Sequence, residues 1–215
     1  MSKIIIITDP PYGMGLDTDY SSLKSNLKFF TEKGLKHGNK YSPVIGDDKP
    51  FDASFLIDKA DEIFLFGADY YIDTLPNYGK DGSWLVWDKR VEENMDRMFG
   101  SSFETIWSKN KHKREIIRVR WAGIFGSEKE QGSHRVHPTQ KPIELLTWII
   151  KKYTNERDII LDLFGGSGST LIACEQTNRI CYMMELDPKY CDVIRKRYSK
   201  FIGKESEWIK ETPVM

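Results

Sequence analysis

The segment from Ile159 to Glu185 constrains the fold more than any other part of the chain. It reads as a short apolar strand, a loop with three glycines, an apolar helix to Thr177 and a second strand at 180–185. A strand, a tight glycine turn, a helix and a second strand form the repeating unit of parallel sheets. The segment therefore predicts an α/β fold with a mostly parallel sheet.

The rest of the chain follows the same alternation of strands and helices. Four consecutive isoleucines in the strand at 3–8 are typical of a strand buried on both faces. Further strands are expected at 62–66, 83–87, 103–107, 116–121 and 158–163, and helices at 51–60, 70–76, 92–99, 142–153 and 189–201. The loop at 13–50, with one short helix expected near 23–32, is long enough to indicate a function. Residues 1–215 are expected to form a single domain.

The composition excludes several classes of protein. With 40% hydrophobic and 30% charged residues among 215, the chain is neither disordered nor a disulfide scaffold. Lysine plus arginine and aspartate plus glutamate are 32 each, so any basic surface must be local. The three cysteines form no Cys-x-x-Cys pair, and no apolar stretch is long enough for a signal peptide or a membrane span. We expect a cytoplasmic protein with reduced thiols.

The glycine loop and the acid after the second strand predict a nucleoside-containing cofactor. The glycines let the backbone turn tightly and approach a ligand, and the helix that follows presents free N–H groups. Glu185 lies 20 residues after Gly165, the distance at which an acid accepts the hydroxyls of a ribose. The loop lacks both the dinucleotide glycine spacing and the Walker lysine. NAD and ATP are therefore weaker candidates than S-adenosylmethionine.

A second motif, Asp9-Pro10-Pro11-Tyr12, directly follows the isoleucine strand. The two prolines fix the backbone and remove two N–H donors, which leaves the Asp9 carboxylate and a proline carbonyl as rigid acceptors. A planar amino group carries two N–H bonds that match two such acceptors. Tyr12 offers an aromatic face on which a base could stack.

Together these motifs resemble those of the amino-group DNA methyltransferases. The family carries a (D/N/S)PP(Y/F/W) tetrapeptide and a FxGxG cofactor loop, which match DPPY at 9–12 and LDLFGGSGST at 161–170. The tetrapeptide precedes the loop, and HPTQKP at 137–142 lies between them, so the circularly permuted order resembles that of the beta group. The resemblance runs from residue 4 to about 201. It implies a Rossmann-like methyltransferase sheet.

The resemblance also implies roles for individual residues. Asp9, Pro10, Pro11 and Tyr12 would be catalytic and would hold the target base. The residues that would bind S-adenosylmethionine are Thr139, Lys141, Asp162, Phe164, Gly165, Gly166, Gly168, Glu185, Leu186 and Asp187. Asp162 and the loop would line the methionine end, Glu185 the ribose, and Leu186 and Asp187 the adenine. Thr139 and Lys141 would close over the carboxylate of the cofactor.

The implied reaction is methylation of an exocyclic amino group on a base that has left the duplex. An aspartate in the tetrapeptide favours the 6-amino group of adenine, and the 4-amino group of cytosine stays open. Two further alternatives are the same chemistry on RNA or a protein amide, and a catalytically silent DNA-binding subunit. The permuted motif order argues against RNA or protein, and the intact motifs argue against a silent subunit.

The sequence departs from the family in two places. A strand and an acid that usually precede the tetrapeptide are missing, which leaves one wall of the adenine pocket in question. The region available for DNA recognition is short, at about 88–136. It contains a basic ribbon that is expected to contact phosphates, formed by Lys109, Lys111, Lys113, Arg114, Arg118 and Arg120. The short region makes a homodimer plausible, and a restriction partner stays open.

A metal site is not expected. His134 and His137 are three residues apart, but no cysteine or further histidine completes a zinc set. The implied reaction is an in-line displacement for which positioning supplies much of the rate, and it needs neither a metal nor a covalent intermediate.

Overall fold

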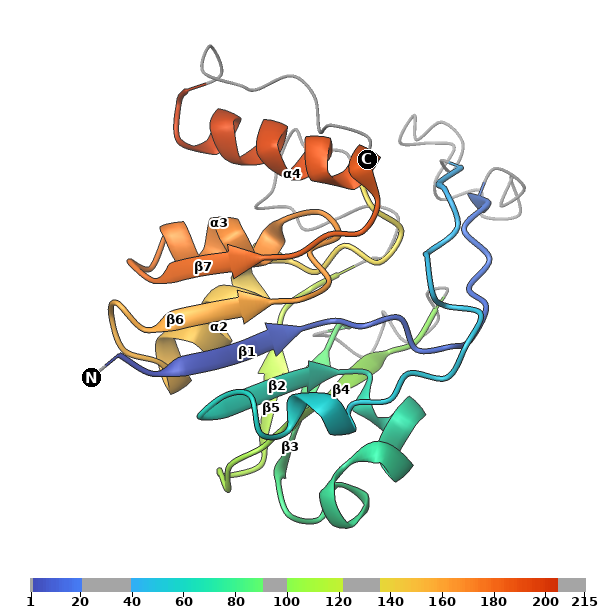
Figure 1. Ribbon diagram of the computed structural model, residues 1–215, viewed down its shortest axis with the longest axis vertical. Helices are drawn as coiled ribbons and strands as arrows, with labels where there is room; N and C mark the ends of the chain where they lie inside the picture. Colours follow the sequence, from blue (N-terminus) through green and yellow to red (C-terminus); the bar gives the residue numbers. More distant parts are fainter. Residues whose placement is uncertain (1, 21–39, 91–99, 122–135, 205–215) are drawn as a thin grey trace.

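A computed structural model describes residues 2–20, 40–90, 100–121 and 136–204, which form a seven-stranded sheet (Figure 1). The strand order is β5-β3-β4-β2-β1-β6-β7. Their bounds are Ile4–Thr8 (β1), Glu62–Phe66 (β2), Ser83–Asp88 (β3), Phe103–Ser108 (β4), Glu115–Arg118 (β5), Ile159–Asp162 (β6) and Ile180–Met183 (β7). Within this sheet only β4 runs antiparallel to its neighbours, which are β2 and β3. The prediction of a mostly parallel sheet is confirmed.

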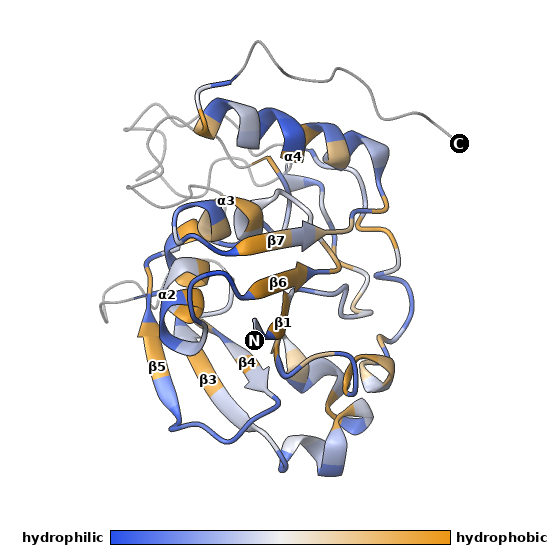
Figure 2. Ribbon diagram, turned by 60° about the vertical axis from the view of Figure 1, so that its left-hand side comes forward, coloured by the Kyte–Doolittle hydropathy of each residue, from blue (hydrophilic) through white to orange (hydrophobic). Residues whose placement is uncertain are grey.

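Alternate side chains of β1 divide the core into two layers. Ile5 and Ile7 face the layer that contains helices α2 (Ile143–Tyr153) and α3 (Ser169–Glu175). Ile6 faces the other layer, which is covered by the segment from Ala53 to Ala60 and by the 3-10 helix η3 (Ala68–Thr74). Because both faces are covered here, β1 and β2 are apolar almost throughout. Figure 2 shows the same apolar character along β1 and β6.

Helix α4 (Pro188–Phe201) lies beyond α3 at the β7 side of the sheet (Figure 1). Asp187 caps it, since its carboxylate accepts a hydrogen bond of 2.9 Å from the backbone N–H of Lys189. Ile194 anchors the helix to the glycine loop, because it fills the space next to Gly165 and Gly168. The N-terminus of α2 differs slightly from the prediction, since Pro142 is its N-cap residue and not part of its first turn.

The connections place two loops at one crevice. From β1 the chain passes to β2 on one side, whereas from β6 it passes to β7 on the other side. When the connections that follow two neighbouring parallel strands leave in opposite directions, a crevice forms beyond the carboxyl ends of these strands. Open α/β sheets bind ligands in such a crevice. The tetrapeptide after β1 and the glycine loop after β6 both lie at this crevice.

Most of the expected helices and strands are present, but the prediction of an α-helix at 51–60 is wrong. The helix expected at 51–60 is a single 3-10 turn, η2 (Ser54–Leu56), between two bends. Polar side chains hold the backbone there, because Asp52 accepts from the N–H of Ser54 and Thr74 accepts from that of Ala53. The helices expected near 23–32 and at 92–99 lie outside the described residues.

Two kinds of feature are absent from the described residues. No helix among them is long and apolar enough to cross a membrane. Within the same ranges, no group of three or more histidine, cysteine, aspartate or glutamate side chains is arranged to hold a metal ion.

Candidate active site

The tetrapeptide forms a rigid turn beside β2. The hydroxyl of Tyr12 donates a hydrogen bond of 2.6 Å to Oδ1 of Asp9, so the ring and the carboxylate fix each other. The ring lies against Gly67, where a Cβ atom would come within 2.2 Å of Cζ of Tyr12. Gly67 also has a φ of +61°. Glycine is required at this position both for the backbone conformation and for the approach of Tyr12.

A buried aspartate that the sequence analysis missed holds the chain after the tetrapeptide. Oδ1 of Asp47 accepts from the backbone N–H groups of Gly13 and Met14, and Oδ2 accepts from that of Leu16 at 2.7 Å. The Asp47 side chain thus fixes the exit of the turn from 31–34 residues away. No local motif marks such a residue, because its partners are backbone groups that only the fold brings near.

A short hydrogen-bond chain joins the two loops. The hydroxyl of Thr8, at the end of β1, donates to Oδ1 of Asp162 at 2.7 Å and accepts from the N–H of Leu163. Asp162 also accepts from the N–H of Phe164. Burial raises the pKa of Asp162 to about 6, although the hydroxyls of Thr170 and Thr8 and the N–H of Phe164 oppose the shift. The tetrapeptide and the glycine loop are therefore parts of one site.

The glycine loop and the acid after β7 are also joined. Oε2 of Glu185 accepts from the N–H of Gly166 at 2.6 Å, and Oε1 accepts from the N–H of Asp187 at 2.9 Å. Each carboxylate oxygen has a second lone pair for a ligand hydroxyl. The carboxylate is held at the mouth of the loop, and its role as the ribose acceptor stays a prediction.

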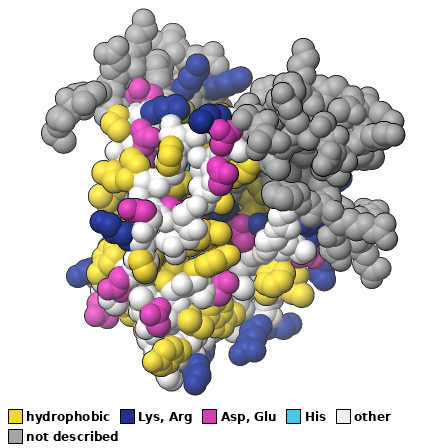
Figure 3. Space-filling model, turned by 90° about the vertical axis from the view of Figure 1, so that its right-hand side faces the viewer, with side chains coloured by type: hydrophobic (Ala, Val, Ile, Leu, Met, Phe, Trp, Pro, Cys, Tyr) yellow, Lys and Arg dark blue, Asp and Glu magenta, His cyan; other side chains and the backbone are white. Residues whose placement is uncertain are grey.

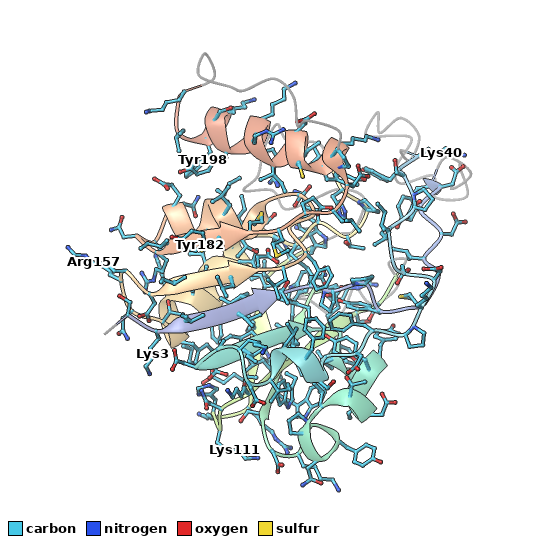
Figure 4. The ribbon with its side chains drawn as sticks, in the orientation of Figure 1. Lys3, Lys40, Lys111, Arg157, Tyr182 and Tyr198 are labelled. Atoms are coloured by element: carbon cyan, nitrogen blue, oxygen red, sulfur yellow. The ribbon has the colours of Figure 1, made fainter. Side chains whose placement is uncertain are left out.

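The side of the site next to Glu185 is open and apolar. Leu186 is 75% exposed and Met184 is 64% exposed, and Tyr182 extends the same surface along β7 (Figure 4). These residues alternate with Cys181 and Met183, which point toward the other face of the strand. An apolar surface beside a ribose acceptor fits an aromatic ring.

The HPTQKP segment lies against the glycine loop through His137. The His137 ring packs beside Gly166 and against the ring of Tyr190, with centroids 4.3 Å apart. The backbone N–H of Thr139 donates to Nδ1 of His137 at 3.2 Å. Thr139 is thus linked to the loop through His137, and its expected closure over the cofactor carboxylate stays a prediction. His137 is buried and supports the loop, a role that the sequence analysis did not assign to it.

Lys141 of the HPTQKP segment lies beside the tetrapeptide. Its ammonium donates to Oδ2 of Asp9 at 2.5 Å and lies 3.4 Å from Oε2 of Glu104. Oε1 of Glu104 is in turn 2.5 Å from the ammonium of Lys89. Lys141 thus pairs with the tetrapeptide aspartate, and its expected closure over the cofactor carboxylate stays a prediction. Glu104, on β4, is a further site residue that the sequence analysis missed.

These four charged groups, of which Lys141 is buried and the other three are partly buried, interact with one another. Burial raises the pKa of Asp9 above its ordinary value, and Lys141 opposes that shift. Burial would also raise the pKa of Glu104, but Lys141 and Lys89 hold it below its usual range. The two carboxylates keep the pKa of Lys141 raised despite its burial. Two ammonium groups and two carboxylates thus alternate with no net charge.

Aromatic rings border the tetrapeptide on the solvent side. The ring of Tyr70 stacks on Tyr12, with centroids 5.1 Å apart and planes 12° apart, and is 57% exposed. Phe51 packs edge-on against Tyr71 and Phe164, so it connects the surroundings of Tyr12 with the glycine loop. Figure 3 views the molecule from the side of the carboxyl ends, where hydrophobic side chains lie between charged ones.

The basic ribbon is divided between two edges of the sheet. Lys109 and Lys111 lie at the amino ends of the parallel strands, where they donate to the backbone carbonyls of Ala60 and Gly82 (Figure 4). Lys113 and Arg114 follow at the same edge, just before β5 begins. Because β5 runs parallel to β3, Arg118 and Arg120 lie at the opposite edge, the one that carries the site. The structure therefore does not bring the six residues together.

Comparison with known proteins identifies the family. The sequence model of the DNA methylase family N6_N4_Mtase matches residues 77–196. The type II methyltransferase M.HpaI of Haemophilus parainfluenzae is 26% identical over 97% of this chain and 73% of its own length. The type II methyltransferase M2.MboI of Moraxella bovis is 33% identical over 54% of this chain and 40% of its own length.

A solved structure shares the fold. The putative DNA modification methylase TTHA0409 of Thermus thermophilus, in complex with S-adenosyl-L-methionine, has a TM-score of 0.53 at 16% identity. The match covers 94% of this chain and 87% of that one. At this identity the likeness concerns the fold alone, which agrees with the Rossmann-like sheet expected from the sequence.

Proposed function

The chain belongs to the DNA methylase family, and on that basis we propose that it transfers a methyl group from S-adenosylmethionine to an exocyclic amino group of DNA. One observation carries the proposal. The tetrapeptide acceptor Asp9 and the glycine loop lie beyond adjacent strands and are joined through Thr8 and Asp162. An amino-group acceptor and a cofactor loop thus share one crevice.

The described residues fit S-adenosylmethionine by their chemistry. Glu185 would accept the ribose hydroxyls, and the exposed side chain of Leu186, with Asp187 beside it, would lie near the adenine. Asp162 and the loop of Phe164, Gly165, Gly166 and Gly168 would surround the methionine end, with Thr139 and His137 behind the loop. The bound cofactor supplies an electrophilic methyl group on a sulfonium. The ligand of the TTHA0409 structure supports this choice.

The tetrapeptide would hold the nitrogen that receives the methyl group. Asp9 and the carbonyl of Pro10 accept hydrogen bonds from the two N–H groups of this nitrogen, and these bonds direct its lone pair toward the methyl group. The nitrogen gains a carbon and then loses one proton. Asp9 is placed to accept that proton, because its carboxylate already accepts a hydrogen bond from the nitrogen and because burial raises the pKa of Asp9.

The target base must leave the duplex to reach Asp9. The stacked pair of Tyr12 and Tyr70 provides aromatic surface for a base at this point. We propose adenine as that base, on the ground of the aspartate in the tetrapeptide. Cytosine is the alternative, since its 4-amino group presents the same two hydrogens.

Glu185→Ala should weaken the binding of S-adenosylmethionine by roughly tenfold to hundredfold, because two charge-assisted acceptors for the ribose are lost. Isothermal titration calorimetry on the protein without DNA measures this directly. Glu175→Ala is a suitable control, since Glu175 is also a carboxylate bonded to a hydroxyl, that of Tyr198. Equal affinities of Glu185→Ala and wild-type protein would refute the ribose assignment.

Replacing Arg118 and Arg120 with glutamine should flatten the salt dependence of DNA binding, because each phosphate contact releases about one counterion. We propose these two as phosphate contacts, since they share the edge of the sheet with the site. Lys111→Gln with Lys113→Gln removes the same charge at the opposite edge and should change the slope less. Fluorescence anisotropy at several salt concentrations compares them, and a larger change from the lysine pair would reverse the assignment.

The proposed function is tested by incubating the protein with methyl-labelled S-adenosylmethionine and unmethylated DNA. Label should enter the DNA. Binding of the cofactor without label in DNA, RNA or protein would instead support a silent subunit, and label in RNA or protein would identify another substrate class.

A further inference from the structure

Both oxygens of the Asp9 carboxylate already have partners. Oδ1 accepts from the hydroxyl of Tyr12 at 2.6 Å, and Oδ2 accepts from the ammonium of Lys141 at 2.5 Å. Under the proposed function, Asp9 must also accept a hydrogen from the target amino group. A carboxylate that is bound tightly by an ammonium is a weaker acceptor for a neutral amino group, because the positive charge of the ammonium compensates much of the negative charge of the carboxylate. Lys141 therefore competes with the substrate.

Glu104 offers the ammonium of Lys141 another acceptor. Its Oε2 atom is buried and has no hydrogen-bond partner among the residues that the structure describes. The ammonium of Lys141 lies 3.4 Å away, within ion-pair distance but without a hydrogen bond. A buried carboxylate oxygen without a hydrogen bond is costly, so a small movement of Lys141 toward it would be favourable.

We propose that Glu104 is a positioning residue that takes the Lys141 ammonium from Asp9 when the target amino group docks. This inference rests on the proposed function. The hydrogen bond from Lys141 to Oδ2 of Asp9 is exchanged for one to Oε2 of Glu104, and Oδ2 then accepts from the base. No hydrogen bond to the two carboxylates is lost, so the exchange can occur in a buried site.

Neighbouring groups are arranged to permit the exchange. Lys89 holds the other oxygen of Glu104 at 2.5 Å, so the carboxylate stays ionised and in place whichever position Lys141 adopts. The ammonium of Lys141 lies over the ring of Phe66, 5.3 Å from its centroid, so a cation–π contact supports the charge at a point within ion-pair distance of both acceptors. After transfer, the return of Lys141 to Asp9 would favour release of the proton that Asp9 has accepted.

Glu104→Gln tests the exchange. The amide keeps the shape but is a weaker acceptor, so Lys141 should stay on Asp9. The single-turnover rate of methyl transfer should fall roughly tenfold to hundredfold, while affinity for S-adenosylmethionine stays within about twofold. Glu115→Gln is the matched control, because Glu115 is similarly buried and pairs with Lys152 at the far edge of the sheet. It should leave the rate unchanged.

A double-mutant cycle separates positioning from a structural role. If Glu104 acts through Lys141, Glu104→Gln should cause little further loss in a Lys141→Gln protein. Additive losses would overturn the proposal, as would an unchanged rate in Glu104→Gln. Glu104→Asp keeps the charge but retracts the acceptor, so it should give an intermediate loss if Glu104→Gln does not fold.

A carboxyl NMR titration of Asp9 needs no substrate and distinguishes failure of this inference from failure of the proposed function. Glu104→Gln removes a negative charge and should lower the pKa of Asp9, whereas Lys141→Gln removes a positive charge and should raise it. Absence of either shift overturns the coupling even if the wild-type enzyme is active. If both pKa shifts occur but wild-type protein methylates no DNA, the proposed function fails. The coupling of the charges would then stand, but no DNA amino group would dock to drive the exchange.

Discussion

An Asp9→Asn protein should lose methyl transfer to DNA by about 10³-fold, because one of the two acceptors that hold the target nitrogen becomes a neutral amide. The amide also presents N–H donors toward the incoming amino group, and it cannot accept the proton that the nitrogen releases. The side chain keeps its size, so the turn of the tetrapeptide and its contact with Gly67 should stay. Single-turnover kinetics with labelled S-adenosylmethionine measure the loss.

Cofactor binding provides the control for this substitution. The Asp9 carboxylate bonds to Tyr12 and Lys141, and neither of these hydrogen bonds reaches the glycine loop. Affinity for S-adenosylmethionine should therefore change by no more than about threefold. Near wild-type transfer by Asp9→Asn would remove Asp9 from the mechanism, and a collapse of cofactor affinity would show that it acts on the loop.

Asp162→Asn should stabilise the protein by about 2 kcal/mol at pH 7 to 8 and at the same time weaken cofactor binding by roughly tenfold. Burial raises the pKa of Asp162 to about 6, above its value in the unfolded chain. The folded state therefore holds the proton more tightly than the unfolded state, and stability falls as pH rises from about 4 to about 6. Asparagine removes this cost, since its oxygen can still accept from Thr8 and Phe164.

The pH dependence provides the control for Asp162. Below about pH 4 the aspartate is protonated in both states, so the stabilities of the two proteins should converge. Urea unfolding at several pH values measures the difference. A stability advantage that is the same at pH 4 and pH 8 would show that ionisation of Asp162 is not its cause. Tighter cofactor binding by Asp162→Asn would contradict its placement at the methionine end.

The sequence predicts the sheet well because the signals for its strands are local. The isoleucine run of β1, the apolar strand before the glycine loop and the face of α2 each identify an element without knowledge of its neighbours. The segment 51–60 misled the prediction for a physical reason. Ala53, Leu56 and Ala60 are buried at helical spacing because they pack against the sheet every three or four residues, although the backbone there makes only one 3-10 turn between two bends.

The charged part of the site could not be predicted in the same way. Glu104 lies on the antiparallel strand β4, more than 90 residues from Asp9, and nothing around it forms a motif. Lys141 lies within a recognised motif, yet its partner depends on how the HPTQKP segment meets β1. Ion pairs between elements that are distant in the sequence depend on the tertiary fold, whereas glycine loops and proline turns are specified by the local sequence.

The same distinction explains the basic ribbon. Lys109 to Arg120 is continuous in the sequence, but β5 carries the chain from one edge of the sheet to the other within it. Charges that are neighbours in sequence therefore face different ends of the molecule. A run of lysines and arginines predicts a common surface only where the chain does not cross the fold.

Methylation of a DNA amino group at this site is tested most directly by identifying the product. The protein is incubated with methyl-labelled S-adenosylmethionine and unmethylated DNA, and the DNA is digested to nucleosides and analysed by mass spectrometry, with Asp9→Asn in parallel. We predict label in N6-methyldeoxyadenosine with wild-type protein and about 10³-fold slower labelling with the variant. Label in N4-methyldeoxycytidine would correct the base, and no labelled nucleoside despite measured cofactor binding would contradict the account.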